Sequence, residues 1–456
     1  MPIGGRFLKL HPATLVLASF LLVIATGTLL LKLPVATTSG HISWIDALFT
    51  ATSGVCVTGL VVVATGNYFT TFGQGVILTL IQIGGLGLMT ISVTLFTWIG
   101  RSISFRHRMA MQDLFAPTPR ADIFNLLKSI VLFTAGAEIA GGIVLTLFWS
   151  REMPLLQAAG TGFFHSISAF CNAGFSLFAD SMMRYSGDLM LNGTVCTLIV
   201  LGGIGFPVLY DLQTWIRPRK RRRRRLSVQT KAVVLTSLIL IVAGALMFAL
   251  LEQLPVAETH SLGHRILTPL FQSITCRTAG FNTVDIAGLN DATLALMIFL
   301  MFFGASPGTC GGGVKTTTLA LLTAFTYSRV RRRRRVDLFK KSIPEETVTR
   351  SVSLVLVSVA LIGLVLFLIL VENTIEGPHA IQTKGAFLAV FFETVSAFGT
   401  VGLSMGVTPE LTLWGKSWII FMMLVGRVGV LTFAYIIVGT GTTNGVAHAE
   451  ENLMIG

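Results

Sequence analysis

The sequence predicts an all-α polytopic membrane protein that is built from four tandem copies of one helix–loop–helix unit. Two observations predict this fold class. Hydrophobic residues make up 53% of the 456-residue chain and charged residues only 12%, and the mean hydropathy is +0.77. A soluble domain carries about 25% charged residues, so most of this chain belongs in a lipid bilayer. In addition, one short pattern occurs four times at long and similar intervals, which is typical of internal repeats.

The repeated pattern is a Phe, a small hydroxyl residue four positions later, and a Gly that is followed by Leu or Phe. The chain contains 46 Gly, so one match would mean little, whereas four matches argue against simple connectors. The glycines lie 115, 106 and 122 residues apart, and each follows its Phe by ten residues, or by nine in the third copy. The four copies contain Phe49, Ser53 and Gly59; Phe164, Ser168 and Gly174; Phe271, Thr275 and Gly280; and Phe392, Ser396 and Gly402.

Each copy is expected to hold a spanning helix, a shorter re-entrant helix, the glycine loop and a second spanning helix. Residues 47–100 contain no Asp, Glu, Lys or Arg, and this run of 54 residues is too long for one span of about 20. The repeats are expected at 1–108, 109–229, 230–341 and 342–456. Their helices are expected at 14–31, 44–53 and 72–99; 126–148, 155–168 and 189–215; 232–251, 263–275 and 292–327; and 351–371, 384–396 and 414–439.

The distribution of basic residues predicts the orientation. The formal net charge is +13, and the basic residues gather after the first three repeats, near 101–108, 217–225 and 329–341, and before the first helix. Because cytoplasmic loops are rich in Lys and Arg, eight spans with both termini in the cytoplasm are expected, with the glycine loops open to the outside. The two arginine runs are expected to contact anionic lipid or a cytosolic partner rather than nucleic acid. The five Cys are expected to be buried thiols.

The glycine loops are suited to cation coordination. Irregular backbone at membrane depth must be buried or line water, and rings of carbonyl oxygens can replace the hydration shell of a cation. Side chains differ between the copies while Gly is constant, as expected if the backbone is the ligand. Around a central pore of pseudo-fourfold arrangement, the predicted filter is formed by Val57, Thr58 and Gly59; Asn172, Ala173 and Gly174; Thr278, Ala279 and Gly280; and Thr400, Val401 and Gly402. His165 and Glu393, each directly after the repeated Phe, are expected to orient the filter from behind.

The second helices carry another repeated motif. Residues 83–87, 201–205 and 425–429 share two glycines, for which close helix packing is the expected reason. Arg427 takes the place of Gly85 and Gly203, and a charge inside an apolar helix predicts a functional role. In the third repeat Pro307 and neighbouring glycines must break the helix. The predicted gate comprises Gly304, Ala305, Ser306, Pro307, Gly308, Thr309, Cys310, Gly311, Gly312, Gly313 and Lys315, with Arg427 beside it.

With these motifs over nearly its whole length, the chain resembles the Ktr/Trk/HKT superfamily of potassium transporters, and most of all the bacterial Ktr ion-translocating membrane subunit. The resemblance implies K⁺ coordination at Gly59, Gly174, Gly280 and Gly402, an intramembrane gate at residues 304–315, and Arg427 in the permeation path. It also implies a homodimer with one pore per protomer in the bacterial plasma membrane. A cytosolic ring that binds nucleotides would regulate the flux, Na⁺ dependence is frequent, and no organic cofactor is implied. The third loop departs from the pattern by one residue.

Two other classes of membrane protein fit the sequence less well. A secondary transporter of another cation or a small solute would show two inverted halves with a broken helix in each, whereas this sequence shows four parallel copies and one predicted break. A membrane enzyme would need paired catalytic groups, and Glu138, Asp211 and Glu393 are scattered, so the chain is not expected to be an enzyme. Residue identities alone do not separate channel-like flux from coupling to Na⁺ or H⁺.

Overall fold

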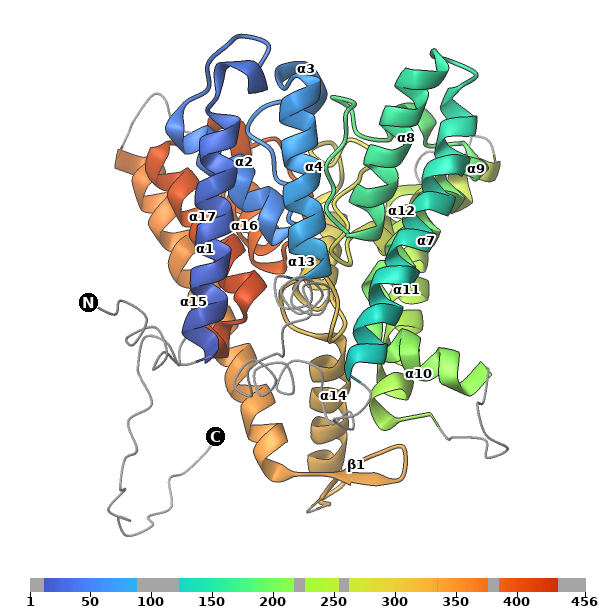
Figure 1. The fold of residues 1–456 in the computed structure, drawn as a ribbon. Helices are drawn as coiled ribbons and strands as arrows, with labels where there is room; N and C mark the ends of the chain where they lie inside the picture. The colour runs from blue at the N-terminus through green and yellow to red at the C-terminus, as the bar shows by residue number, and fades with distance from the viewer. Residues whose placement is uncertain are drawn as a thin grey trace, which may run out of the picture.

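The computed structural model describes residues 12–87, 123–216, 226–253, 262–333, 335–375 and 385–433 (Figure 1). Within these ranges the regular elements are helices and one two-stranded hairpin. Each repeat begins with a long outer helix, continues with a short inner helix that ends at a glycine loop, and returns through a second helix. The repeats contain α1 (Pro12–Leu31), α2 (Trp44–Cys56) and α4 (Thr71–Leu86); α7 (Ile123–Trp149), α8 (Leu155–Phe170), α9 (Leu189–Ile204) and α10 (Phe206–Ile216); α11 (Val228–Gln253), α12 (Leu262–Thr275), α13 (Asp291–Phe302) and α14 (Thr316–Val330); and α15 (Glu345–Ile375), α16 (Ala386–Gly399) and α17 (Leu413–Val428).

The four repeats close into a ring. The second helix of each repeat packs on the short inner helix of the next, in the pairs α4 with α8, α9 with α12, α13 with α16, and α17 with α2. The last pair joins the fourth repeat to the first, where Lys416 and Asp46 also form an ion pair of 2.8 Å. This order of contacts is the predicted pseudo-fourfold arrangement. Shorter elements lie in the connections: η3 (Pro34–Ala36), α3 (Thr65–Tyr68), η4 (Met183–Tyr185) and η6 (Thr408–Glu410).

The repeated Phe and the residue after the repeated Gly anchor each copy in its neighbour. All four Phe side chains are buried, as are Leu60, Phe175, Phe281 and Leu403. Phe164 and Phe175 share an apolar cluster with first-repeat residues, and Phe271 and Phe281 share one with second-repeat residues. Phe49 and Leu60 lie in a cluster made largely of third- and fourth-repeat side chains. Because lipid tails are as apolar as these side chains, close van der Waals packing rather than exclusion of water favours these contacts, and the sequence pattern thus encodes the assembly of the ring.

The outer helices present apolar side chains to the outside. By length and composition, α7, α11 and α15 can each cross a bilayer, and between 28% and 33% of their spanning windows is buried inside the protein. Large apolar residues such as Leu132, Leu238, Leu246, Leu356 and Phe367 are exposed on them. An exposed apolar belt of this kind is expected for a protein that is solvated by lipid tails.

The second helices differ from the expectation of unbroken spans. Only the third was predicted to break, yet α4 ends at Leu86, α17 ends at Val428, and the α9–α10 pair is bent by 97° at Gly205. Each of these helices ends at the last glycine of its motif, and Gly87, Gly205 and Gly429 all have positive φ (79°, 98° and 96°). Glycine reaches this conformation without the steric cost of a Cβ, so it terminates a helix readily. The predictions of continuous helices at 72–99, 189–215 and 414–439 were therefore wrong at these three glycines, and residues 88–99 and 434–439 lie outside the described residues.

The third repeat also ends differently from expectation. After α14, strands β1 (Val336–Leu338) and β2 (Lys341–Ile343) form an antiparallel hairpin whose turn residues Phe339 and Lys340 both have positive φ. Figure 1 shows this hairpin at the lower end of the molecule, joining α14 to α15. The repeat boundaries predicted at 108, 229 and 341 stay predictions; residue 341 begins β2, and residue 229 lies at the start of α11. The basic residues at 101–108 and 217–225 and both chain ends lie outside the described residues.

Candidate functional site

The four repeated glycines come together at the centre of the ring of repeats. A Cβ added to Gly59 would collide with the Ala173 carbonyl oxygen, and one added to Gly174 would lie 2.8 Å from the Gly280 Cα. In the same way Gly280 faces the Val401 oxygen and Gly402 faces the Thr58 oxygen. Each glycine thus touches the backbone of the next repeat, and the fourth touches the first. Only glycine permits four backbones to approach one another this closely.

Each glycine loop has the same backbone pattern. Two residues before each glycine the φ angle is positive: 57° at Val57, 57° at Asn172, 73° at Thr278 and 47° at Thr400. The glycines themselves have φ of 90°, 69°, 81° and 92° in chain order, whereas the residue between has no positive φ. Left-handed residues thus alternate with ordinary ones in all four loops. The third loop, whose register departed by one residue in the sequence, adopts the same pattern as the others.

The hydroxyl residue of the pattern braces its loop from the end of the short helix. The Ser53 Oγ accepts from the Gly59 N–H at 3.0 Å, and the Ser396 Oγ accepts from the Gly402 N–H at 3.1 Å. The hydroxyls of Ser168 and Thr275 instead donate to the carbonyl oxygens of Phe175 and Phe281, at 2.8 and 2.7 Å.

A backbone bond adds a second brace to every loop. The N–H of the middle loop residue donates to the carbonyl of the hydroxyl residue, from Thr58 to Ser53 at 2.8 Å in the first loop. This bond spans five residues in three loops but only four in the third, from Ala279 to Thr275 at 2.9 Å. The end of the third short helix therefore compensates for the missing residue, and Gly280 occupies the position equivalent to the other repeated glycines.

The segment between α13 and α14, residues 303–315, is called the interhelical loop below. It packs directly on the third and fourth glycine loops: the Gly312 N–H donates to the Thr400 Oγ1 at 2.7 Å, and an added Cβ on Gly313 would lie 3.1 Å from the Gly399 Cα. Towards the second helices, the Gly313 N–H donates to the Gly426 oxygen at 3.3 Å. The predicted break is confirmed in position, and the loop covers one side of the ring.

Further contacts tie the interhelical loop to the first and second repeats. The Cys310 thiol donates to the Gly85 oxygen at 2.8 Å, and the Phe206 N–H donates to the Gly308 oxygen at 3.2 Å. These partners are the places where α4 ends and where α9 bends into α10. The loop thus rests against the interrupted second helices of all the other repeats.

Two cationic side chains lie at the interhelical loop. The Lys315 Nζ donates to the oxygens of Gly311 and Gly312 at 2.6 and 3.2 Å, so its ammonium holds the loop from within. The Arg427 guanidinium reaches across from α17 and donates to the Gly84 oxygen on α4. Both residues line a cavity of about 300 Å³ together with Gly85, Phe206 and Gly311. A positive charge beside a cavity in the ring raises the energy of a cation there.

Comparison with known proteins agrees with this arrangement. Residues 7–438 match the TrkH family, described as cation transport proteins. The chain belongs to the TrkH family. It is 36% identical to the Ktr system potassium uptake protein B of Bacillus subtilis, over 96% of each chain. Its identity to the protein of the same name from Vibrio alginolyticus is 38%, over 97% of this chain and 94% of the relative. Both relatives are named as uptake proteins rather than as enzymes.

Two further relatives extend the comparison. The potassium/sodium uptake protein NtpJ of Enterococcus hirae is 33% identical over 98% of each chain. The crystal structure of the potassium transporter TrkH from Vibrio parahaemolyticus is similar with a TM-score of 0.69 at 18% identity, over 95% of this chain and 86% of that one. This likeness confirms the predicted fold class, an all-α membrane protein of four repeats.

In three repeats of this TrkH-family chain, the residue directly after the repeated Phe holds the segment that leaves the glycine loop. His165 accepts from the Ser176 hydroxyl at 3.0 Å and from the Leu177 N–H at 3.3 Å. The Gln272 amide donates to the Thr283 hydroxyl at 3.1 Å, and Glu393 accepts from Ser404 at 2.8 Å and from Thr408. The described contacts of His165 and Glu393 therefore agree with the expectation that these residues support the loops from behind.

The structure gives Glu138 a place that the sequence did not indicate. Its carboxylate on α7 accepts from the Gln82 amide on α4 at 3.2 Å and from the thiol of Cys171, just before the second glycine loop, at 3.8 Å. An added Cβ on Gly85 would collide with the same Cys171 sulfur. Glu138 thus joins the outer helix of the second repeat to the first repeat behind the loop. All five cysteines are free thiols, and only Cys196 is not fully buried.

Proposed function

We propose that this chain is the ion-translocating subunit of a bacterial potassium uptake system in the plasma membrane, with both termini in the cytoplasm. The closed ring of four glycine loops carries the proposal, because four copies of one backbone pattern around a common centre suit a spherical ion. The relatives, which are named as potassium uptake proteins, supply the choice of ion. Na⁺ dependence is part of the proposal, since one relative is named for both potassium and sodium.

In the proposed mechanism, carbonyl oxygens of the glycine loops replace the water around K⁺. The K⁺ sites lie at the level of Gly59, Gly174, Gly280 and Gly402. The side chains at the position before the glycine are Thr, Ala, Ala and Val, so the backbone is what the four loops share. Bracing by Ser53, Ser168, Thr275 and Ser396 fixes the carbonyls before the ion arrives, which lowers the cost of ordering on binding.

The interhelical loop is the proposed gate. It lies against the third and fourth glycine loops and contains no regular helix, so it can move without unwinding a span. Lys315 holds it in its present shape, and Arg427 adds a positive charge to the cavity beside it. We further propose that a cytosolic nucleotide-binding ring subunit moves this loop, and that two copies of the chain form a dimer with separate pores.

A secondary transporter of another cation or a small solute is the alternative. The second helices are interrupted in at least three repeats, at Gly205, at residues 303–315 and at Gly429, and these breaks weaken the sequence argument against a secondary transporter. The ring order argues for the potassium pathway instead, because the four repeats pack on one another cyclically rather than as two halves.

The test is K⁺-limited growth and K⁺ uptake in a bacterium that lacks its own uptake systems and expresses a cytosolic Ktr partner. Gly280→Ser should raise the K⁺ requirement, because its Cβ would lie 2.5 Å from the Val401 oxygen at a φ of 81°. Gly363→Ser on α15 is the matched control, since an added Cβ there meets open space. Failure of the wild type to rescue growth, despite correct insertion, would favour the solute transporter. Equal behaviour of the two variants would exclude Gly280 from the pathway.

A further inference from the structure

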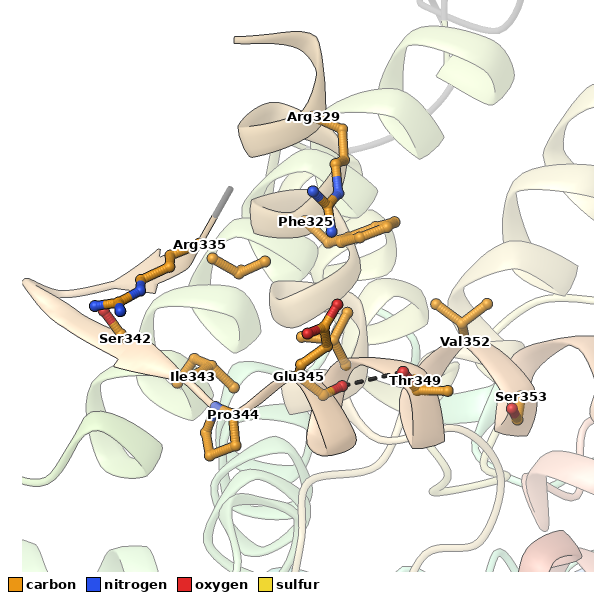
Figure 2. Close-up of a pocket in the computed structure, with 12 residues that line it drawn as sticks. Phe325, Arg329, Arg335, Ser342, Ile343, Pro344, Glu345, Thr349, Val352 and Ser353 are labelled. Carbon is orange, nitrogen blue, oxygen red and sulfur yellow. Dashed lines mark hydrogen bonds between the residues drawn. The ribbon is translucent and has the colours of Figure 1, made fainter. Parts of the chain in front are cut away.

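A second cavity lies far from the ring, between α14, α15 and the β1–β2 hairpin. Its volume is about 630 Å³, and Figure 2 shows its lining residues. A small apolar cluster of Leu321, Val336 and Val348 holds the hairpin against both helices. The walls are thus fixed by packing between three elements, and the cavity is a built feature of the fold.

Basic side chains line this cavity from two elements. Arg329 near the end of α14 lies over the Phe325 ring, with its guanidinium carbon 5.2 Å from the ring centroid, and Arg335 lies on the hairpin side next to Ser342 (Figure 2). Neither arginine takes part in an ion pair among the described residues. The hydroxyls of Ser342, Thr349 and Ser353 and the carboxylate of Glu345 complete the polar lining, and the Ser342 hydroxyl donates to the neighbouring Asp337 carboxylate at 2.6 Å. Two arginines against one carboxylate favour an anionic ligand that also carries hydroxyl groups.

An apolar path leads away from the cavity along α15. Val352 lines the cavity, and Leu356, Val359 and Phe367 follow on the same helical face, spaced by three, four or eight residues. These three side chains are 65%, 56% and 62% exposed, and a Cβ at Gly363 between them would meet open space. This face belongs to the helix that is apolar enough to cross a bilayer. A polar cavity at the end of an exposed apolar helix face matches the polar headgroup and the apolar chains of a phospholipid.

We propose that this cavity binds the headgroup of an anionic glycerophospholipid, phosphatidylglycerol by its chemistry. Its phosphate pairs with Arg329 and Arg335, its glycerol hydroxyls donate to Glu345, and an acyl chain follows the Leu356–Phe367 face. The site is coupled to the interhelical loop, because α14 begins at Thr316, directly after Lys315. Its 15 residues extend about 22 Å from that loop to the cavity. Lipid bound at Arg329 therefore fixes the far end of the helix that leaves the proposed gate.

The experiment is a titration of the purified full-length protein with phosphatidylglycerol, followed by native mass spectrometry. The variant Arg329→Gln/Arg335→Gln is compared with Arg332→Gln/Arg333→Gln, which removes the same charge from the same run but does not line the cavity. Both double variants lose the same general attraction to anionic lipid, but only the cavity variant also loses direct charge-assisted hydrogen bonds to the phosphate, each of which is worth a factor of roughly ten. The cavity variant should therefore bind at least about tenfold more weakly than the control. Val352→Trp, which fills the cavity without changing charge, should also weaken binding.

Three results would overturn the proposal. Equal losses of phosphatidylglycerol affinity in the two double variants would mean that the lipid is attracted by surface charge alone. Tighter binding of phosphatidylethanolamine than of phosphatidylglycerol would exclude a site for an anionic headgroup. A change in oligomeric state by mass photometry, with lipid binding unaltered, would assign the face to a second copy of the chain. Lipid binding is measured without transport, so a failure of the potassium proposal in uptake assays would be recognised separately.

Discussion

Replacing Thr400 with Val removes one hydrogen bond that joins the fourth glycine loop to the interhelical loop. The Thr400 Oγ1 accepts from the Gly312 N–H at 2.7 Å, and both residues lie in the protein interior. The backbone tolerates the change, because Val57 occupies the equivalent position of the first loop with a φ of 57°, close to the 47° of Thr400. Valine also has nearly the shape of threonine. The substitution therefore tests the bond and little else.

The size of the expected effect follows from the Gly312 N–H, which loses its hydrogen-bond acceptor. A buried donor left unsatisfied costs about 1–3 kcal/mol. In the proposed mechanism this cost falls on the closed arrangement alone, because a displaced interhelical loop exposes its N–H groups to water. Since about 1.4 kcal/mol is a factor of ten, the equilibrium should shift towards the open arrangement by roughly fivefold to 150-fold. Uptake in the absence of the cytosolic partner should rise, while the preference for K⁺ over Na⁺ should stay unchanged.

The assay is Rb⁺ or K⁺ uptake into proteoliposomes that contain the purified chain without its partner. Thr278→Val is the matched control, because Thr278 is the equivalent residue of the third loop and its hydroxyl has no partner among the described residues. It should leave uptake near the wild-type rate. Equal rates for the two variants would refute the idea that this bond holds the gate closed. A loss of ion preference without a change in rate would place the effect in the glycine loop instead.

Three other predictions concern the same structure. Deletion of residues 308–313 should raise K⁺ flux and weaken its control by the cytosolic partner; unchanged flux would remove the gate assignment. Arg427→Gln should alter the rate or its regulation while the thermal unfolding temperature is maintained, and an effect on neither would make Arg427 a packing residue. Asp46→Asn removes the 2.8 Å ion pair with Lys416, in which the Asp46 side chain is 22% exposed and the Lys416 side chain 13%. The free energy of unfolding should fall by about 1–2 kcal/mol, measured by thermal unfolding. Glu346→Gln, in a pair with both side chains exposed, is its control and should cost almost nothing.

The ring could be predicted from the sequence because each part of the repeated pattern has one local task. Phe49 and its counterparts anchor a repeat in its neighbour, Ser53 and its counterparts brace the loop, and the glycine permits close approach. These tasks act over a dozen residues and recur four times, so the pattern is visible without any knowledge of the fold. In the shortened third copy, Gly280 has a positive φ like the other three repeated glycines, and the end of α12 accommodates the missing residue.

The breaks at Gly87, Gly205 and Gly429 were missed although their signal was present. The motif contains two kinds of glycine with different tasks. Gly84, Gly202 and Gly426 pack against carbonyl oxygens at the ends of the short helices, where a Cβ would collide, as close packing predicts. The last glycine of each motif instead takes a positive φ and ends the helix. Composition does not distinguish these two tasks, and an apolar continuation beyond the glycine concealed the break.

Other features depend on contacts between distant parts of the chain. The hairpin turn is formed by Phe339 and Lys340 rather than by the Asn or Gly that usually occupy positive φ, so no turn signal was available. Glu138 finds its partners at Gln82 and Cys171, on two different repeats. The cavity of about 630 Å³ needs α14, α15 and the hairpin together. Each of these follows from tertiary packing, which a local pattern cannot encode.

The asymmetry of the fourfold ring explains why one repeat carries the proposed gate. In the second and fourth repeats the interruption is one glycine, after which helix resumes at Phe206 and at Val430. A break of one residue changes the direction of a helix but provides no loop segment that could move independently. The third repeat instead has the whole of residues 303–315 between α13 and α14, and this segment packs on two glycine loops at once through Gly311 and Gly312. Because it shares the Thr400 hydroxyl with the fourth loop, movement of the segment and the conformation of the ring are mechanically linked. In the proposed mechanism, one lengthened break in an otherwise repeated design is therefore sufficient to add regulation to the pathway that the four repeats form.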